Sequence, residues 1–443
     1  MPIARARRRI TGWDVSVLVA ANAVVVAGLW WRQGGIREIH DVAGLLTSLG
    51  RVTGLLGAYL ALVELLLLAR IPVLDAVGLE RTSRWHRLNG IACLALLLAH
   101  TVLITAGYAL DDGVPVLRET DDLLTRYSGV LLATVGLGLL VVVVVSSVVA
   151  VRRRLSYRVW HALHVSAYLA IALGFSHQLA TGREFQGQPV ARAYWWALYA
   201  VALGLLVGLR LALPIARSLR HRLRIERVVP EAPGIVSIQI GGVGLERLPV
   251  RAGQSLHWRF LARGHWWETH PFSLSAAPDG RRLRITVKDV GDYTRRLASL
   301  PVGTRVIVEG PSGGLTSAAR RHARVALIAG GVGIAPIRAL LEDTPGEPGT
   351  IAVIYRAGSE ADVLFRDELD ELARRRGAAL HYVLGERRGD ELLSAEHLQA
   401  LVPDIASRDV YVCGPPRLTE VTLASLRRAG VPRRHIVSEG FGW

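Results

Sequence analysis

The segment Val159–Ala180 reads VWHALHVSAYLAIALGFSHQLA and carries the main clue to the architecture of this chain. A helix of about 20 apolar residues is long enough to cross a bilayer, and this segment meets that length. It nevertheless contains three histidines, His161, His164 and His177. Because an ionisable side chain is costly inside hydrocarbon, intramembrane histidines are expected to serve a function.

Apolar composition is uneven along the 443 residues. Long Leu, Val and Ala runs dominate up to about residue 215, and beyond it charged residues recur every few positions. Six segments of the first part are long enough to span a bilayer. They are Trp13–Trp31, Leu45–Ala69, Leu88–Leu110, Tyr127–Val151, Val159–Ala180 and Tyr194–Ile215. The sequence therefore predicts a six-helix all-α transmembrane bundle, assigned to residues 1–220, followed by a soluble part.

The arginines predict the orientation of these helices. Four arginines lie in each of the N-terminal tail, the 70–87 connection and the 152–158 connection, whereas the three alternate connections carry two each. By the positive-inside rule both termini are expected in the cytoplasm of a multi-pass protein of the cell (plasma) membrane. The first segment ends in Trp30 and Trp31 without a small-residue cleavage pattern, so we expect a retained helix rather than a signal peptide.

The charge and cysteine content exclude some functions. The net charge of +16 could suggest nucleic acid, but Lys288 is the only lysine and the arginines are scattered or flank apolar runs. No nucleic-acid partner is therefore expected. Cys93 and Cys413 are too few for a disulfide framework.

Four histidines are spaced for metal binding between two helices. His86 and His100 are fourteen positions apart, which is about 21 Å along a helix and returns to nearly the same face. His164 and His177 lie at comparable depths in the fifth segment. We expect an inner haem held by His86 and His164 and an outer haem held by His100 and His177. Histidines that hydrogen-bond across the bundle or line a polar cavity are the alternative.

One feature of the spacing opposes this pairing. Thirteen positions separate His164 from His177, which places them on different faces of an ideal helix. Either the helix tilts or deforms, for example near Gly174, or the assignment is wrong. Exchanging His164 for His161 does not repair the angle.

The soluble part contains two patterns. From about residue 221, RLRIERVVPEAPGIVSIQIGG alternates β-branched residues with turns, which is typical of a small β-domain. From Ala323, ARVALIAGGVGIAPIRALLED predicts a strand, a glycine-rich turn and a helix, although its glycines depart from the G-x-G-x-x-G spacing. The segments TIAVIYRAG and DVYVCGPPRL add further strands. Together they predict a parallel sheet with a ligand at the carboxyl ends of its strands.

Several motifs resemble, in order, those of the ferric-chelate reductase and NADPH oxidase superfamily. They are ARIPVLDAVGLERTSRWHR leading into His86, HPFSLSAAP at 270–278, VGDYT at 290–294, EGPSGG at 309–314, AGGVGIAPI at 329–337 and YVCGPP at 411–416. The resemblance covers essentially the whole chain. It implies an FAD-binding β-barrel domain at 221–318 and an NADPH-binding α/β domain at 319–443.

The resemblance also implies roles for residues around the flavin. The stretch with His270, Pro271, Phe272 and Ser273 would bind the isoalloxazine ring, with the Ser273 hydroxyl near flavin N5 or O4. Gly291 and Thr294 would approach the FAD pyrophosphate. A C-terminal aromatic residue would cover the flavin, and we expect Phe441 rather than Trp443.

For the nucleotide, Gly330, Gly331, Gly333 and Pro336 would hold the NADPH pyrophosphate, and Cys413, followed by Gly414 and Pro415, would lie near the nicotinamide. Arg356 follows a strand and is placed for the 2′-phosphate, with Arg366 as the alternative. In the membrane part we expect Arg51 to bind propionates of the outer haem rather than only to extend its charge to water.

These expectations combine into one function. Cytoplasmic NADPH would reduce FAD, and electrons would pass through two b-type haems to a small-molecule acceptor outside. Ile104 stands where oxygen-reducing relatives tend to have a histidine, and the outer connections are short, so a permissive reductase of ferric chelates is expected. The alternatives are a superoxide-generating NADPH oxidase and an electron feeder for a separate extracytoplasmic redox protein. No obligate protein partner is evident.

Overall fold

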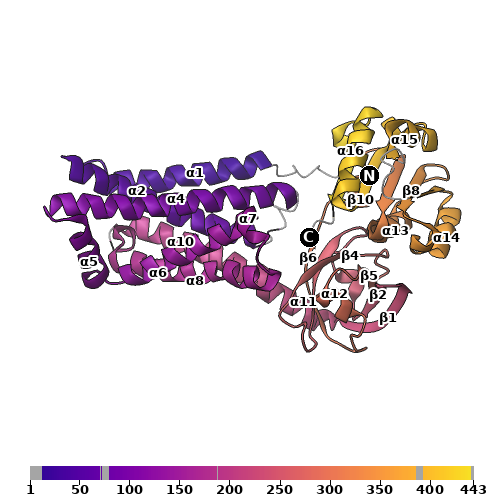
Figure 1. Ribbon diagram of the computed structural model, residues 1–443, viewed down its shortest axis with the longest axis horizontal. Coiled ribbons are helices and arrows are strands. Elements are labelled where there is room, and N and C mark those ends of the chain that lie inside the picture. The colour runs from indigo at the N-terminus through magenta and orange to yellow at the C-terminus, as the bar shows by residue number, and fades with distance from the viewer. Residues whose placement is uncertain (1–11, 70, 72–78, 187, 386–392, 441–443) are drawn as a thin grey trace, which may run out of the picture. The chain divides into compact units, whose positions relative to one another are not determined.

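The structure is a computed structural model that describes residues 12–69, 71, 79–186, 188–385 and 393–440 (Figure 1). The chain divides into two compact units, Met1–Leu209 and Arg210–Trp443, and each is described here by itself.

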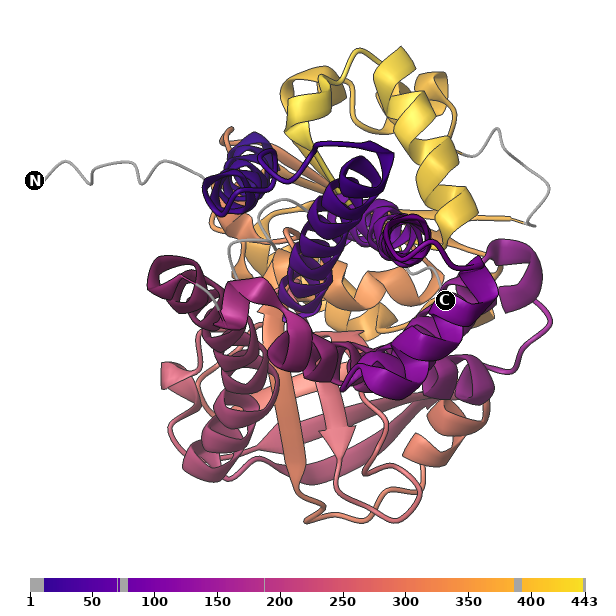
Figure 2. The ribbon, with the colours of Figure 1, turned by 90° about the vertical axis from the view of Figure 1, so that its left-hand side faces the viewer.

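The first unit is a bundle of long helices that run alongside one another (Figures 1 and 2). Among the described residues, six helices are long and apolar enough to cross a membrane, and the prediction of six spans is confirmed. They are α1 (Gly12–Arg32), α2 (Val42–Leu68), α4 (Leu79–Asp111), α6 (Val130–Ser147), α8 (Tyr157–Thr181) and α10 (Pro189–Val207). The short helices α7 (Val149–Arg152) and α9 (Arg183–Gln186) flank α8, and a π-turn, η1 (Gly208–Ala212), leads from α10 to α11 (Leu213–His221).

The connection 109–127, which the sequence suggests is a short loop, contains the helix α5 (Val116–Arg126). Pro115 precedes the helix, Glu119 lies in its first turn and Arg126 in its last turn. This arrangement suits the helix dipole, which favours acidic groups at the start and basic groups at the end. Glu119 and Leu123 are buried, so this connection is more ordered than a bare loop.

Close packing of α2 on α4 depends on three glycines of α2. A Cβ added at Gly50, Gly54 or Gly57 would lie within 2.8, 2.5 and 2.8 Å of Ile104, His100 and Leu97, respectively. Small residues on one helix face allow two membrane helices to approach closely. The glycines of α2 therefore fix how closely His100 can lie against that helix.

The second unit begins with a β-domain. One antiparallel sheet has the order β1 (Arg224–Ala232), β2 (Ile235–Gly241), β5 (Arg282–Lys288), and the other has β4 (His270–Ser273), β3 (Ser255–Phe260), β6 (Val306–Ser312). Single bridges between Leu274 and Ile285 and between Arg224 and Arg305 join the sheets at both edges. The sheets enclose one apolar core with Trp258 at its centre, as a small barrel requires. The short helix α12 (Asp292–Leu297) follows β5.

The rest of the unit is an α/β domain with a five-stranded parallel sheet, as the sequence predicts. The order is β11 (Ile436–Gly440), β10 (Asp409–Gly414), β7 (Val325–Gly330), β8 (Ile351–Ala357), β9 (Ala379–Leu384). The helices are α13 (Ile334–Asp343), α14 (Arg366–Arg376), α15 (Ala395–Leu401) and α16 (Pro416–Arg428). Residues from both faces of the sheet form apolar clusters, which is why β7 and β10 are buried at every position.

Candidate functional site

The four histidines predicted as metal ligands lie in two pairs inside the bundle. The ring centroids of His86 and His164 are 5.7 Å apart, and those of His100 and His177 are 6.3 Å apart. His86 and His100 both come from α4, which packs mainly on α2, whereas His164 and His177 both come from α8, which packs mainly on α6. In each pair, one histidine comes from the helix pair α2–α4 and the other from the helix pair α6–α8. The two rings of each pair therefore meet where these helix pairs contact.

The helix α8 is continuous through Gly174, so the deformation considered from the sequence is not a break at that glycine. Both histidines of α8 nevertheless place their rings near a ring of α4. The Cβ atom places the imidazole well away from the helix axis. Rotation about χ1 and χ2 therefore moves the ring farther around the helix than the position of its Cα atom suggests.

Every one of these four imidazoles has its Nδ1 engaged by a neighbouring oxygen. The Nδ1 of His100 contacts the carbonyl oxygen of Gly50 at 2.8 Å, and the Nδ1 of His177 contacts Thr181 Oγ1 at 2.9 Å. The Nδ1 of His164 lies 3.3 Å from Ser147 Oγ. The Nδ1 of His86 contacts a carboxylate oxygen of Glu64. Within the part of the chain that the structure describes, the Nε2 atoms of these rings take part in no hydrogen bond.

This pattern fits a metal ligand. A ligating histidine usually directs its second ring nitrogen to a carboxylate, carbonyl or hydroxyl, which fixes the tautomer and the orientation of the ring. Metal–imidazole bonds are about 2 Å long, so two rings at the observed centroid spacings are close enough to bind one ion between them. The histidines present therefore fit the iron of a bis-histidine haem, one for each pair.

Glu64 lies beside His86 and is a candidate site residue that sequence reasoning missed. It is a carboxylate inside α2, and its two oxygens contact His86 Nδ1 and, at 2.6 Å, Asn89 Nδ2. A charged group in a membrane helix is costly unless it has partners such as these. The signal was present in the sequence as a lone acidic residue within the apolar run LALVELLLL.

Arg51 lies on α2 beside Gly50, the residue whose carbonyl contacts His100. Its guanidinium is paired with the carboxylate of Glu38, which also pairs with Arg183. Arg51 thus has a protein partner, Glu38, that lies outside the apolar part of the bundle. The propionate role expected from the resemblance would be additional to this ion pair.

In the β-domain, the predicted flavin segment forms the edge strand β4. Pro271 is tolerated there because an edge strand has one side without ladder hydrogen bonds. Phe272 is buried, and the His270 ring stacks on Tyr293 with centroids 3.8 Å apart. Ser273 is 6% exposed, and its Oγ has no hydrogen-bond partner among the described residues. A buried hydroxyl without a partner is costly, and a polar ring atom of a flavin would satisfy it.

Gly291 and Thr294 lie at the start of α12. Thr294 Oγ1 accepts a hydrogen bond from the Val290 amide and donates one to the Gly291 carbonyl, so this hydroxyl shapes the loop. Thr294 also lines a pocket of about 510 Å³ between the β1–β2 turn and α12. The structure brings both residues to the start of α12, and Thr294 lines a space that is open to a ligand.

The glycine-rich loop joins β7 to α13. Gly331 has a φ of +53°, and a Cβ on Gly333 would lie 2.3 Å from the Cys413 carbonyl oxygen. The residues predicted for the nicotinamide end are therefore beside this loop, because Cys413 and Gly414 end the neighbouring strand β10 and Pro415 precedes α16. Pro336 lies in the first turn of α13, where a missing amide hydrogen breaks no helical bond.

Arg356 and Arg366 are the two candidates for binding the 2′-phosphate. Arg356 lies at the carboxyl end of β8, paired in register with Gly330 of the glycine-rich loop. Arg366 begins α14, where it pairs with Glu360 and stacks over Tyr382 at 4.4 Å. The register places Arg356 at the same sheet edge as the glycines.

Glu439 is a second residue that sequence reasoning missed. It lies on β11 in register with Cys413, and its carboxylate accepts a hydrogen bond from the Gly314 amide at 3.0 Å. Burial raises the pKa of Glu439 to about 7, and burial likewise raises the pKa of the Cys413 thiol. A carboxyl that titrates near neutrality beside a predicted nicotinamide site is a candidate for controlling protons there. The aromatic residues expected to cover the flavin, Phe441 and Trp443, lie outside the described residues.

Comparison with known proteins identifies two domains. Residues 53–175 match the family model of the ferric reductase like transmembrane component, and residues 327–423 match the oxidoreductase NAD-binding domain. The chain thus combines a match to a ferric-reductase-like transmembrane component with a match to an oxidoreductase NAD-binding domain. The order of its two domains fits the ferric reductase and NADPH oxidase superfamily.

Relatives with curated descriptions match the soluble part. NADH-cytochrome b5 reductase 1 of Laccaria bicolor is 31% identical over 182 residues, which is 38% of this chain and 59% of that protein. Ferredoxin--NADP reductase B of Sorangium cellulosum is 29% identical over 188 residues, 38% of this chain and 77% of that protein. The chain therefore spans less than two thirds of the first of these relatives.

Among solved structures, the flavohem-like FAD/NAD binding domain of nitric oxide dioxygenase from Vibrio cholerae O1 biovar El Tor is similar to half of this chain. The match has a TM-score of 0.43 and 22% sequence identity, and it covers 50% of this chain and 98% of that chain.

Proposed function

We propose that this chain carries electrons from cytoplasmic NADPH, by way of FAD and two b-type haems, to an acceptor on the other side of the plasma membrane. The acceptor class we propose is ferric chelates. The observation that carries the proposal is the arrangement of His86 with His164 and His100 with His177, each with its Nδ1 engaged and its ring beside that of its partner.

Haem would supply one-electron transfer and flavin the exchange between a two-electron hydride and single electrons, which no side chain supplies alone. The protein's own contribution is to hold the irons at fixed positions. His86 and His100 would ligate from α4, and His164 and His177 from α8. The oxygens at their Nδ1 atoms would keep the Nε2 lone pairs directed at the metal.

The surroundings of the two pairs differ in charge. The His86 imidazole contacts the carboxylate of Glu64, whereas the His100 and His177 imidazoles contact a carbonyl and a hydroxyl. A negative charge beside a metal ligand favours the oxidised metal. We therefore expect the His86–His164 site to have the lower reduction potential, so that electrons run downhill from it to the His100–His177 site.

The soluble part would bind the flavin and the nucleotide. The unpartnered Ser273 hydroxyl would bind a polar atom of the flavin ring, with His270, Pro271 and Phe272 beside it. The loop of Gly291 and Thr294 would hold the FAD pyrophosphate. The glycine-rich loop with Gly330, Gly331, Gly333 and Pro336 would hold the nucleotide pyrophosphate at the start of α13.

The identity of the nucleotide and the orientation of the chain are parts of the same proposal. Arg356 would bind the 2′-phosphate and so favour NADPH over NADH, while Cys413, Gly414 and Pro415 would contact the nicotinamide end. Both termini would lie in the cytoplasm. Arg51 would bind propionates of the haem between His100 and His177, with Glu38 as its protein partner.

The acceptor is tested with the purified full chain in vesicles, by following NADPH consumption with a ferric chelate under anaerobic conditions and with oxygen alone. Fast turnover on ferric chelate and slower superoxide formation are expected. If oxygen alone supports the maximal rate and ferric chelate adds nothing, the chain is an oxidase. If neither small molecule supports turnover while a redox protein does, the chain is an electron feeder.

A further inference from the structure

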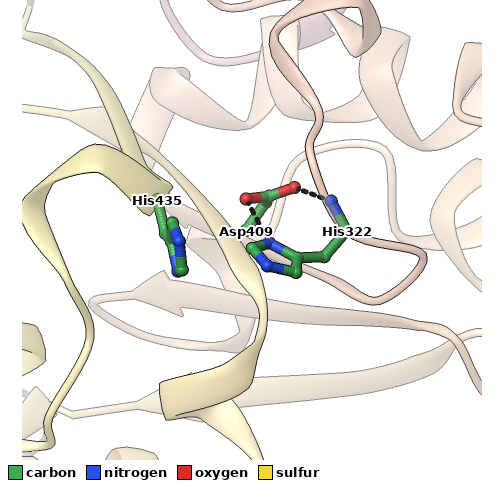
Figure 3. Close-up of side chains that lie close together, drawn as sticks. All are labelled: His322, Asp409 and His435. Atoms are coloured by element: carbon green, nitrogen blue, oxygen red, sulfur yellow. Dashed lines mark hydrogen bonds and ion pairs between the residues drawn. The ribbon is translucent and has the colours of Figure 1, made fainter.

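Three chemistry-bearing residues meet at the amino ends of adjacent strands of the parallel sheet. His322 shortly precedes β7, Asp409 is the first residue of β10, and His435 directly precedes β11. Because the strand order is β11-β10-β7, their starts lie side by side. The ligand atoms of the three residues all lie within 4.8 Å of one another (Figure 3).

We propose that His322, Asp409 and His435 form a binding site for a divalent transition-metal ion of the zinc class. The site is separate from the proposed nucleotide site, since Asp409 begins β10 and Cys413 lies near its other end. At about 3.3 Å per residue, these ends are roughly 13 Å apart. Neither the proposed electron path nor any residue of the glycine-rich loop depends on this cluster.

The carboxylate of Asp409 is held in a fixed orientation. Its Oδ2 accepts hydrogen bonds from the backbone amides of Arg321 and His322, at 2.5 and 2.6 Å. Its Oδ1 lies 3.0 Å from the Nδ1 of His322, as the dashed lines in Figure 3 show. Asp409 is 2% exposed. The amides hold one oxygen in place, and the other is shared with the His322 imidazole, so a bound ion would replace the proton between Oδ1 and Nδ1.

His435 supplies the second, independent observation. Its ring lies 4.4 Å from that of His322, measured between centroids, and its Nδ1 is buried without a hydrogen-bond partner among the described residues. A buried polar atom without a hydrogen-bond partner is unfavourable, and a ligand, an ion or a water molecule would satisfy it. The Nε2 of His435 is 3.3 Å from the Nε of Arg434, an exposed side chain that can turn away when the imidazole binds a metal through Nδ1.

The ligand types select the metal. Two imidazoles and one carboxylate suit zinc and its neighbours in the first transition row, whereas Mg²⁺ and Ca²⁺ prefer oxygen ligands throughout. Three protein ligands leave a fourth position of a tetrahedral ion for water. Arg324 and Arg408 are both paired with Asp404, whereas Arg321 and Arg434 place positive charge beside His435. The carboxylate of Asp409 therefore supplies the negative charge that a cation needs at this site.

A metal here would join three strands at one end. The strand β11 lies at the edge of the sheet, with β10 as its neighbouring strand, and it carries Glu439 to its place beside Cys413. A bond from His435 through the ion to Asp409 would fasten the start of that edge strand. Because an ion that binds only the folded state stabilises it, loading the site should raise the unfolding temperature.

The test uses the tag-free, full-length protein with its cofactors bound, after chelator treatment. Zn²⁺ affinity is measured by competition with a chromophoric chelator, and Co²⁺ serves as a spectroscopic probe of the ligand set. The variants are His322→Gln and His435→Gln, and the matched control is His397→Gln, a histidine of α15 in the same domain. NADPH-dependent flavin reduction, unchanged in all four proteins, shows that each is folded.

One saturable Zn²⁺ site per chain is expected, with visible Co²⁺ bands typical of low coordination number. The affinity should fall at least about tenfold in each cluster variant and stay unchanged in the control. The proposal is overturned if the wild type shows no saturable site, or if Zn²⁺ binds the wild type and both cluster variants equally.

Discussion

The imidazole of His86 lies with its centroid 5.7 Å from that of His164, while its Nδ1 contacts the carboxylate of Glu64. Helices α4, α8 and α2 thus each contribute one residue to a single cluster inside the bundle. The two rings come from α4 and α8, whereas the carboxylate beside them comes from α2, so the proposed haem ligands and the charge beside them can be changed separately by mutation.

The ligand assignment predicts the effect of His86→Ala. The variant should retain one haem of the two, since the His100–His177 pair is untouched, and NADPH should still reduce the flavin because hydride transfer is confined to the soluble part. The measurement is haem content per chain together with stopped-flow flavin reduction. His161→Ala is the matched control on α8 and should keep both haems; two haems in His86→Ala would show that the ligand is another residue.

The contact between Glu64 and His86 predicts a change in potential. Glu64→Gln removes a negative charge beside the ligand, so the potential of the haem at this site should rise by on the order of 60 mV, equivalent to about tenfold in a one-electron equilibrium. A spectroelectrochemical titration resolves the two haems. Thr181→Val, which removes the hydroxyl beside His177, should alter only the other haem. Superimposable titration curves for the wild type and Glu64→Gln would show that Glu64 does not affect the haem potential.

Nucleotide preference should depend on Arg356. Arg356→Ala removes the cation proposed to bind the 2′-phosphate, so KM for NADPH should rise at least about tenfold while KM for NADH changes little. Steady-state kinetics with both nucleotides measure this. Arg366→Ala is the comparison variant, and a selective loss in that protein instead would move the phosphate site to α14.

The raised pKa of Glu439 predicts how stability depends on pH. Burial raises this pKa from 4.5 to about 7, so the folded state binds the proton more tightly than the unfolded state. The resulting stabilisation is complete below about pH 4.5 and is lost as pH rises towards 7, at no more than about 1.4 kcal/mol per pH unit. Glu439→Gln keeps the acceptor for the Gly314 amide and cannot ionise.

The melting temperature of Glu439→Gln should therefore increase relative to that of the wild type between pH 5 and pH 8. Thermal unfolding across this range provides the measurement. A constant difference between the two proteins would mean that Glu439 titrates at its ordinary pKa in the folded state.

The sequence predicted the large features of the fold because these depend on local patterns. Length and hydropathy were sufficient for the six membrane helices. The strand–glycine–helix pattern was sufficient for the parallel order of the sheet, and the expected glycine-rich loop and Cys413 do lie side by side. In these cases the deciding interactions lie within one element or between neighbouring elements.

Other features depend on contacts that no local pattern contains. The cluster of His322, Asp409 and His435 exists only because β7, β10 and β11 are neighbours in the sheet, which the chain order does not reveal. Glu64 meets His86 because glycines of α2 bring that helix close to α4. The helix α5 was missed because its apolar positions are few and because a short polar connection between two apolar segments is typical of a loop.

Haem and flavin content per polypeptide decide whether the two histidine pairs hold haem. A reduced-minus-oxidised absorption spectrum of the purified full chain, with both cofactors quantified per polypeptide, should show two b-type haems and one flavin. The variant His100→Ala should show one haem and the same flavin content. A wild-type protein that contains flavin but no haem, or a His100→Ala protein that still contains two haems, would contradict the account.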